Sequence, residues 1–103
     1  MQYEWDETKN LRNQSKHIGI SFELATLVFD EPNCSIALDR VDETGELRWR
    51  AVGVVHIESE PFGVLLVVHA YRKDIHGQEI IRIISARRAE KHELRRYQKQ
   101  EVD

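Results

Sequence analysis

One segment of the chain joins an apolar run to a cluster of cations: Ile80-Ile81-Arg82-Ile83-Ile84-Ser85-Ala86-Arg87-Arg88-Ala89. Its β-branched first half predicts a strand over residues 79–84, because short apolar runs bounded by turn residues are typical of buried strands. The residues that follow, 90–97, are polar and basic and are compatible with a helix. We therefore expect a strand, then a turn that carries Arg87 and Arg88, then a C-terminal helix.

Positive charge is concentrated in this C-terminal segment of an otherwise acidic protein. Residues 82–99 contain seven basic residues against the two carboxylates of Glu90 and Glu93, whereas residues 1–81 hold 8 basic and 14 acidic residues. The net charge of the 103-residue chain is −3, which argues against binding of nucleic acid over the whole surface. We expect a local, salt-sensitive surface for an anion in the C-terminal segment.

Two helices are predicted upstream of this segment. Asp6 is a suitable N-cap for a short polar helix over residues 7–17, and His17 closes it. Ser21 is a suitable N-cap for a second helix, in which Phe22, Ala25, Val28 and Phe29 recur at helical spacing until Pro32 ends it.

The remaining pattern predicts strands joined by short links. Besides the strand at 79–84 and a short one at the N-terminus around Tyr3, apolar runs predict strands at 34–39, 47–57 and 64–71. Short links favour antiparallel neighbours. The predicted fold class is α+β: a short N-terminal strand, two helices packed on an antiparallel β-meander, and a C-terminal helix.

Length and composition limit the classes of protein that this chain can form. The 103 residues predict a single domain, and no run of about 18 apolar residues is long enough to span a membrane. Cys34, the one cysteine, has no partner within the chain, and the N-terminus does not resemble a secretory signal. We therefore expect a cytoplasmic protein.

The arginines are candidates for holding a phosphate. A guanidinium stays charged and pairs bidentately with phosphate, so convergence of Arg82, Arg87 and Arg88, with Arg48 and Arg72 from neighbouring strands, predicts an anion site. The alternative is that these arginines form surface ion pairs with the many carboxylates.

The histidines do not predict a metal site. No pair among the five histidines has the spacing of a helical zinc motif, and we expect neither a metal ion nor another cofactor. His17 is a candidate for acid–base catalysis, with a role as the helix-closing residue as the alternative. No glycine-rich phosphate loop and no Gly-x-Ser-x-Gly motif is present, which argues against nucleotide hydrolysis and serine-hydrolase chemistry.

Several motifs occur together in one order: Trp5-Asp6-Glu7-x-Lys9, Lys16-His17-x-x-x-Ser21-Phe22, Phe29, Glu46-x-Arg48-Trp49, and Ile83-Ile84-Ser85-Ala86-Arg87-Arg88-Ala89 with Glu93. With these motifs the chain resembles the BrnT family of bacterial type II toxins, from Tyr3 to about Tyr97. The resemblance implies a RelE-like fold and cleavage of RNA that inhibits translation. It also implies neutralisation by a BrnA-type ribbon-helix-helix antitoxin, through which the pair binds operator DNA.

The resemblance also implies roles for particular residues in metal-independent cleavage of RNA. The catalytic candidates are Arg87, Arg82, His17, Glu46 and Lys9, with either His17 or Glu46 as the general base. The candidates for contact with RNA phosphates are Arg48, Arg72, Arg88, Arg95 and Tyr97. Two other functions are compatible with the same residues: an RNA- or ribosome-binding module without enzymatic activity, and an attenuated toxin that binds the antitoxin as a co-repressor.

Overall fold

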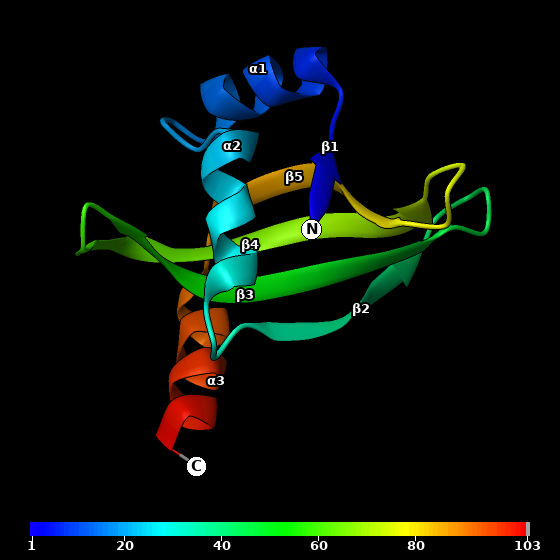
Figure 1. Cartoon of the computed structure of the whole chain (residues 1–103). Coiled ribbons are helices and arrows are strands. Elements are labelled where there is room, and N and C mark those ends of the chain that lie inside the picture. The colour runs from blue at the N-terminus through cyan, green and yellow to red at the C-terminus, as the bar shows by residue number, and fades with distance from the viewer. Residues whose placement is uncertain (103) are drawn as a thin grey trace.

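The computed structural model describes residues 1–102, which form a five-stranded mixed sheet with helices on both of its faces (Figure 1). The elements are β1 (Gln2–Glu4), α1 (Glu7–Lys16), α2 (Phe22–Ala25), the 3₁₀ helix η1 (Thr26–Asp30), β2 (Ser35–Val41), β3 (Leu47–Ile57), β4 (Glu60–Lys73), β5 (Glu79–Arg88) and α3 (Lys91–Val102). The strand order is β1-β5-β4-β3-β2. Strands β2 to β5 form the predicted antiparallel meander, and β1 pairs with β5 in parallel. The predicted α+β class is confirmed.

Strand β5 is longer than predicted. Arg87 lies opposite Leu66 of β4 and Arg88 lies opposite Leu65, so the prediction that the two arginines occupy a turn is wrong. Residues 85–88 contain none of the Gly, Pro, Asn or Asp residues that favour a turn, and pairing with β4 therefore continues through them. Because successive residues of a strand point to opposite faces, Arg87 and Arg88 are separated by the sheet.

The helix caps agree with the sequence. The Asp6 carboxylate accepts a hydrogen bond from the backbone N–H of Lys9 at 3.1 Å, and His17 is the C-cap of α1. The Ser21 hydroxyl oxygen accepts one from the N–H of Leu24 at 3.0 Å, which starts α2. The predicted second helix is divided, because α2 tightens into η1 before Pro32.

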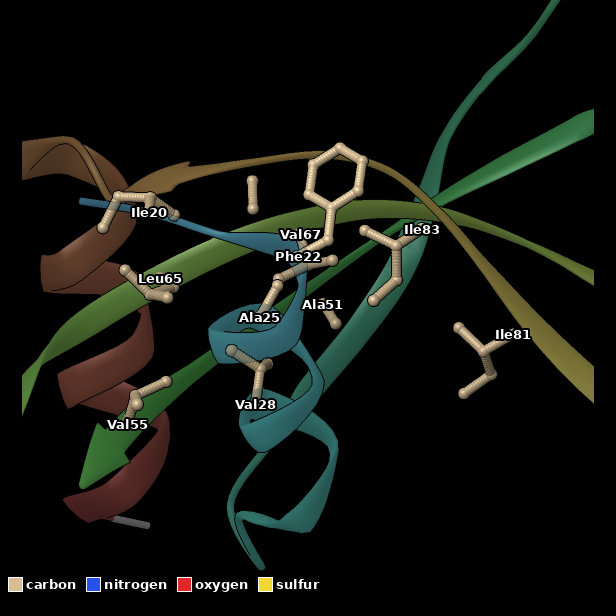
Figure 2. Close-up of a cluster of buried hydrophobic side chains, with 11 residues drawn as sticks. Ile20, Phe22, Ala25, Val28, Ala51, Val55, Leu65, Val67, Ile81 and Ile83 are labelled. Atoms are coloured by element: carbon tan, nitrogen blue, oxygen red, sulfur yellow. The ribbon is translucent and has the colours of Figure 1, made fainter. Parts of the chain in front are cut away.

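The main core lies between the α2–η1 segment and one face of the sheet (Figure 2). Phe22, Ala25 and Val28 from this segment are fully buried. They pack with strand residues that include Ala51, Val55, Leu65, Val67, Ile81 and Ile83. Gly53 allows η1 to approach β3, since a Cβ atom there would lie 3.2 Å from the Val28 carbonyl oxygen.

A buried asparagine ties α1 to the edge of the sheet. Asn13 Nδ2 donates to the carbonyls of Ile20 at 2.9 Å and Ala86 at 2.8 Å, and Asn13 Oδ1 accepts from the N–H of Ala86 at 3.2 Å. Strand β1 pairs with β5 only from Ile80 to Arg82, so it does not reach Ala86. Asn13 therefore makes the hydrogen bonds that a neighbouring strand would make there.

The opposite face of the sheet is partly covered by α3. Tyr97 of α3, a predicted contact for RNA phosphates, is 4% exposed and packs with Val52 and Leu66. A bulge at Ile84 shifts the register of β5, so that Arg82 and Arg87 lie on this same face although they are an odd number of positions, five, apart in the sequence. We call this side of the sheet the arginine face; its arginines include Arg48, Arg50, Arg72, Arg82 and Arg87.

No helix within residues 1–102 is long and apolar enough to cross a bilayer.

Candidate active site

A hollow of about 380 Å³ opens on the arginine face beside α3. We call it the sheet hollow, and it is lined by Asp39, Arg50, Leu66, Val68, Arg87, His92, Glu93 and Arg96. Two of these side chains are apolar, while the others supply three guanidiniums, one imidazole and two carboxylates. A concave site with converging cations and titratable groups is suited to chemistry on an anionic substrate.

Arg87 is oriented in the sheet hollow by a bidentate ion pair. Its two terminal nitrogens donate to the two carboxylate oxygens of Glu93 at 2.8 and 2.9 Å. Glu93 also accepts a hydrogen bond from the backbone N–H of Glu90 at 2.8 Å, so the same carboxylate caps the start of α3. The hydrogen bonds from Arg87 lower the pKa of Glu93 to about 2, and the pair raises the pKa of Arg87. The pair fixes the plane of the guanidinium.

Four residues of the sheet hollow were not among the predicted site residues: Asp39, Arg50, His92 and Arg96. Arg50 had a signal, because it follows Arg48 by two residues on a predicted strand and so shares its face. Arg96 also had one, since it is three residues from Glu93 and next to Tyr97 on a predicted helix. Asp39 had none. It lies at the irregularity in β2 and is 3.7 Å from Arg50.

A second concave surface lies between α1 and the edge of β5. We call it the helix groove; it has a volume of about 420 Å³ and is lined by Lys9, Arg12, Asn13, Lys16, His17, Ile84, Ser85, Ala86 and Arg87. The structure thus brings together three of the predicted catalytic residues, Lys9, His17 and Arg87. Arg87 lines both the helix groove and the sheet hollow, so the two surfaces meet at this residue.

Arg88 belongs to a different surface. Its guanidinium lies over the Phe62 ring, 4.4 Å from the centroid, and donates to the Phe62 carbonyl at 3.3 Å. Arg88 lines a smaller cavity with Arg87, His17 and Ile20 and is absent from the linings of the sheet hollow and the helix groove. Arg82, Arg87 and Arg88 therefore do not converge on one surface as predicted; Arg87 and Arg88 share only this smaller cavity.

Other predicted residues lie outside both surfaces. Arg82 is paired with Glu4 at 2.6 Å, and Glu46 is paired with Arg72 at 3.4 Å rather than with Arg48. Arg95 is exposed on α3 and does not line the sheet hollow.

Arg48 of β3 supports the β2–β3 turn, because it donates a hydrogen bond to Asp42 at 3.1 Å. The pKa of Asp42 lies well below its usual range, chiefly because the Thr44 hydroxyl donates to it, with further donors that include Arg48. Arg48 therefore helps to hold a turn.

Within residues 1–102, no cluster of three or more His, Cys, Asp or Glu side chains is arranged to bind a metal ion. Positive charge at the sheet hollow comes from its arginines.

The family model described as "Ribonuclease toxin, BrnT, of type II toxin-antitoxin system" matches residues 5–93. The chain belongs to the BrnT family. No curated protein matches the chain. The match covers Arg50, Arg87, His92 and Glu93 and ends before Arg96. As a type II toxin family of ribonucleases, the BrnT family implies an RNA target and an antitoxin partner.

The Arg87–Glu93 pair of this BrnT-family protein predicts a pH-dependent contribution to stability. The pKa of Glu93 is depressed from 4.5 to about 2. The stabilisation is therefore complete above about pH 5 and is lost as the pH falls from there toward 2. We expect Glu93→Gln to lower the free energy of unfolding at pH 7 by about 1–2 kcal/mol and to leave stability near pH 2 almost unchanged.

Urea denaturation of both proteins across this pH range measures the effect. Glu90→Gln is the control, because Glu90 is exposed and lies 3.7 Å from Arg87 without the bidentate geometry. A constant difference between Glu93→Gln and the parent protein at every pH would contradict the assignment.

Proposed function

We propose that this BrnT-family protein is a metal-independent endoribonuclease that cuts RNA at the sheet hollow. The observation that carries the proposal is the arrangement around Arg87, where Arg50, Arg96 and His92 line the same concave surface. Arginines there supply the positive charge that metal ions supply in many nucleases. Histidine supplies proton transfer near neutral pH.

The proposed reaction needs no group beyond the chain and the RNA. The 2′-hydroxyl oxygen of a ribose attacks the adjacent phosphorus, the bond from phosphorus to the 5′-oxygen breaks, and a 2′,3′-cyclic phosphate and a 5′-hydroxyl are formed. Arg87, with Arg50 and Arg96, holds the phosphate and stabilises the negative charge that builds up on its oxygens.

His92 is the group that we assign to proton transfer. It lies in the sheet hollow on the first turn of α3, and its side chain is 62% exposed, so a substrate can reach it. His17 lines the helix groove on the other side of Arg87 and is the alternative general base. Glu46 is engaged with Arg72 outside the hollow, which argues against this second sequence-based candidate.

We expect His92→Gln to lower the rate of RNA cleavage by about a hundredfold, because positioned acid–base groups typically contribute at least this factor. His17→Gln is the matched variant and should have a smaller effect. Cleavage of a labelled RNA under single-turnover conditions measures both rates. A hundredfold loss in His17→Gln with normal activity in His92→Gln would move the proton-transfer role to the helix groove.

The cellular consequence that we propose is inhibition of translation in the cytoplasm, with neutralisation by a BrnA-type ribbon-helix-helix antitoxin. Support comes from the family, whose members are toxins of type II systems. Expression of the chain without its antitoxin, with growth and new RNA 5′ ends followed together, tests this proposal. Growth arrest with new ends supports a ribonuclease. Arrest without new ends would indicate an RNA- or ribosome-binding module, and no arrest would indicate an attenuated toxin that acts as a co-repressor.

A further inference from the structure

The helix groove differs from the sheet hollow in how its positive charge is balanced. On the arginine face, five arginines each lie within 4.0 Å of a carboxylate: the pairs are Arg48–Asp42, Arg50–Asp39, Arg72–Glu46, Arg82–Glu4 and Arg87–Glu93. Within residues 1–100, the side chains of Lys9, Arg12 and Lys16 make no such ion pair. No Asp or Glu lines the groove. Although the protein is acidic overall, the positive charge of this concave surface is not balanced by nearby carboxylates.

The three cations form one ridge along α1. Lys9, Arg12 and Lys16 are spaced three and four residues apart, which places them on one side of the helix over a length of about 10 Å. Like charges at this spacing destabilise a helix. Lys16 is in the last turn, where the helix dipole compensates a cation, but Lys9 and Arg12 have no such compensation. A ligand with regularly spaced negative charges would offset this repulsion.

The groove and the sheet hollow share Arg87 in their linings. We propose that the helix groove binds the backbone of single-stranded RNA beside the cleaved phosphate, with Arg12 and Lys16 each contacting a phosphate. This inference rests on the proposed function, because it extends the path of the RNA from the sheet hollow along α1.

An acidic segment of the antitoxin is the other ligand class that such a surface suits, but the lining favours RNA. Protein interfaces are anchored by buried apolar and aromatic side chains. The groove has no aromatic residue in its lining, and its apolar part consists of Ile84 and Ala86. Contacts to a nucleic-acid backbone need only charge and spacing.

The test compares the double variant Arg12→Gln/Lys16→Gln with the control Lys73→Gln/Lys99→Gln, which removes the same charge from exposed positions outside the groove. Fluorescence anisotropy measures binding of a labelled RNA of roughly ten nucleotides whose 2′-O-methyl groups prevent cleavage. We expect the groove variant to bind about tenfold more weakly and to lower the slope of log K against log salt by about 1.4, since each phosphate contact on a single strand contributes about 0.7. The control variant should lose less RNA affinity, and its salt slope should change less.

Cleavage assays separate this inference from the proposed function. The groove variant should cut a mixture of ribodinucleotides as fast as the parent protein, because a dinucleotide does not extend into the groove, and should have a raised KM on long RNA. A groove variant with parental affinity, salt slope and KM on long RNA would overturn the inference. The inference would also be overturned if the groove variant bound RNA as the parent protein does but bound the antitoxin more weakly, because the groove would then be a protein interface. Failure of the parent protein to cut any RNA would refute the proposed function, while the anisotropy difference would still report on the groove.

Discussion

Replacing Arg87 with glutamine is expected to lower the rate of RNA cleavage by about a thousandfold while the chain remains folded. Arg87 lines both concave surfaces, and its guanidinium is held by Glu93 in a fixed orientation. Glutamine keeps a polar side chain but removes the charge and the fork that match a phosphate. Single-turnover cleavage of a labelled RNA measures the loss, and circular dichroism checks the fold.

The neighbouring arginine supplies a matched control. Arg88→Gln removes the same charge one residue along β5, on the opposite face of the sheet, where Arg88 contacts Phe62. We expect less than a tenfold change in cleavage rate, because pairing along β5 turns this side chain away from the sheet hollow. Equal losses of cleavage rate in Arg87→Gln and Arg88→Gln would show that the face of β5 on which an arginine lies does not determine its role in cleavage.

The largest effect on stability is expected for Asn13→Ala, which should lower the free energy of unfolding by about 3 kcal/mol. Asn13 is 7% exposed and satisfies the backbone N–H and carbonyl of Ala86 and the carbonyl of Ile20. Alanine leaves these buried groups without their partner and loosens α1 from β5. Urea denaturation should show a lower midpoint with a similar slope.

Asn33→Ala is the control for this prediction, because Asn33 is exposed in the loop before β2. It should change the free energy of unfolding by less than about 0.5 kcal/mol. If Asn13→Ala were equally mild, the hydrogen bonds to the β5 edge would not be important for stability.

The fold was predictable because local signals agreed with each other. The caps at Asp6 and Ser21 and the alternation around Trp49 each point to the element that forms. The extension of β5 was not predictable, since residues 85–88 have no apolar run that would indicate a strand, and pairing with β4 determines their conformation. The parallel pairing of β1 with β5 is likewise a long-range contact that no local pattern specifies.

The candidate site was predictable in part. Lys9, His17 and Arg87 come from motifs far apart in the chain, and the structure places them around one groove. Arg82 and Arg88 looked equivalent to Arg87 in the sequence, but the ion pair with Glu4 and the strand alternation separate them from it. His92 and Asp39 join Arg87 through tertiary packing of α3 and the irregularity in β2. Periodicity alone does not reveal such contacts.

The arginines had two interpretations from the sequence, as surface ion pairs or as a phosphate site, and the ion pairs do not exclude the proposed phosphate site. The pairing of five arginines with carboxylates is what a surface of ion pairs predicts. In the proposed function the same pairing also orients the Arg87 guanidinium, and a phosphate would contact it through the N–H groups that Glu93 does not occupy. The proposed proton transfer by His92 and the uncompensated charge along α1 would distinguish this site from an ordinary charged surface.

The most direct measurement is the chemistry of the RNA ends that the purified protein produces in the presence of EDTA. The account predicts 5′-hydroxyl and 2′,3′-cyclic phosphate ends with the parent protein, and their loss with folded Arg87→Gln. Intact RNA with a folded parent protein, or equal cleavage by both proteins, would contradict a metal-independent ribonuclease centred on Arg87.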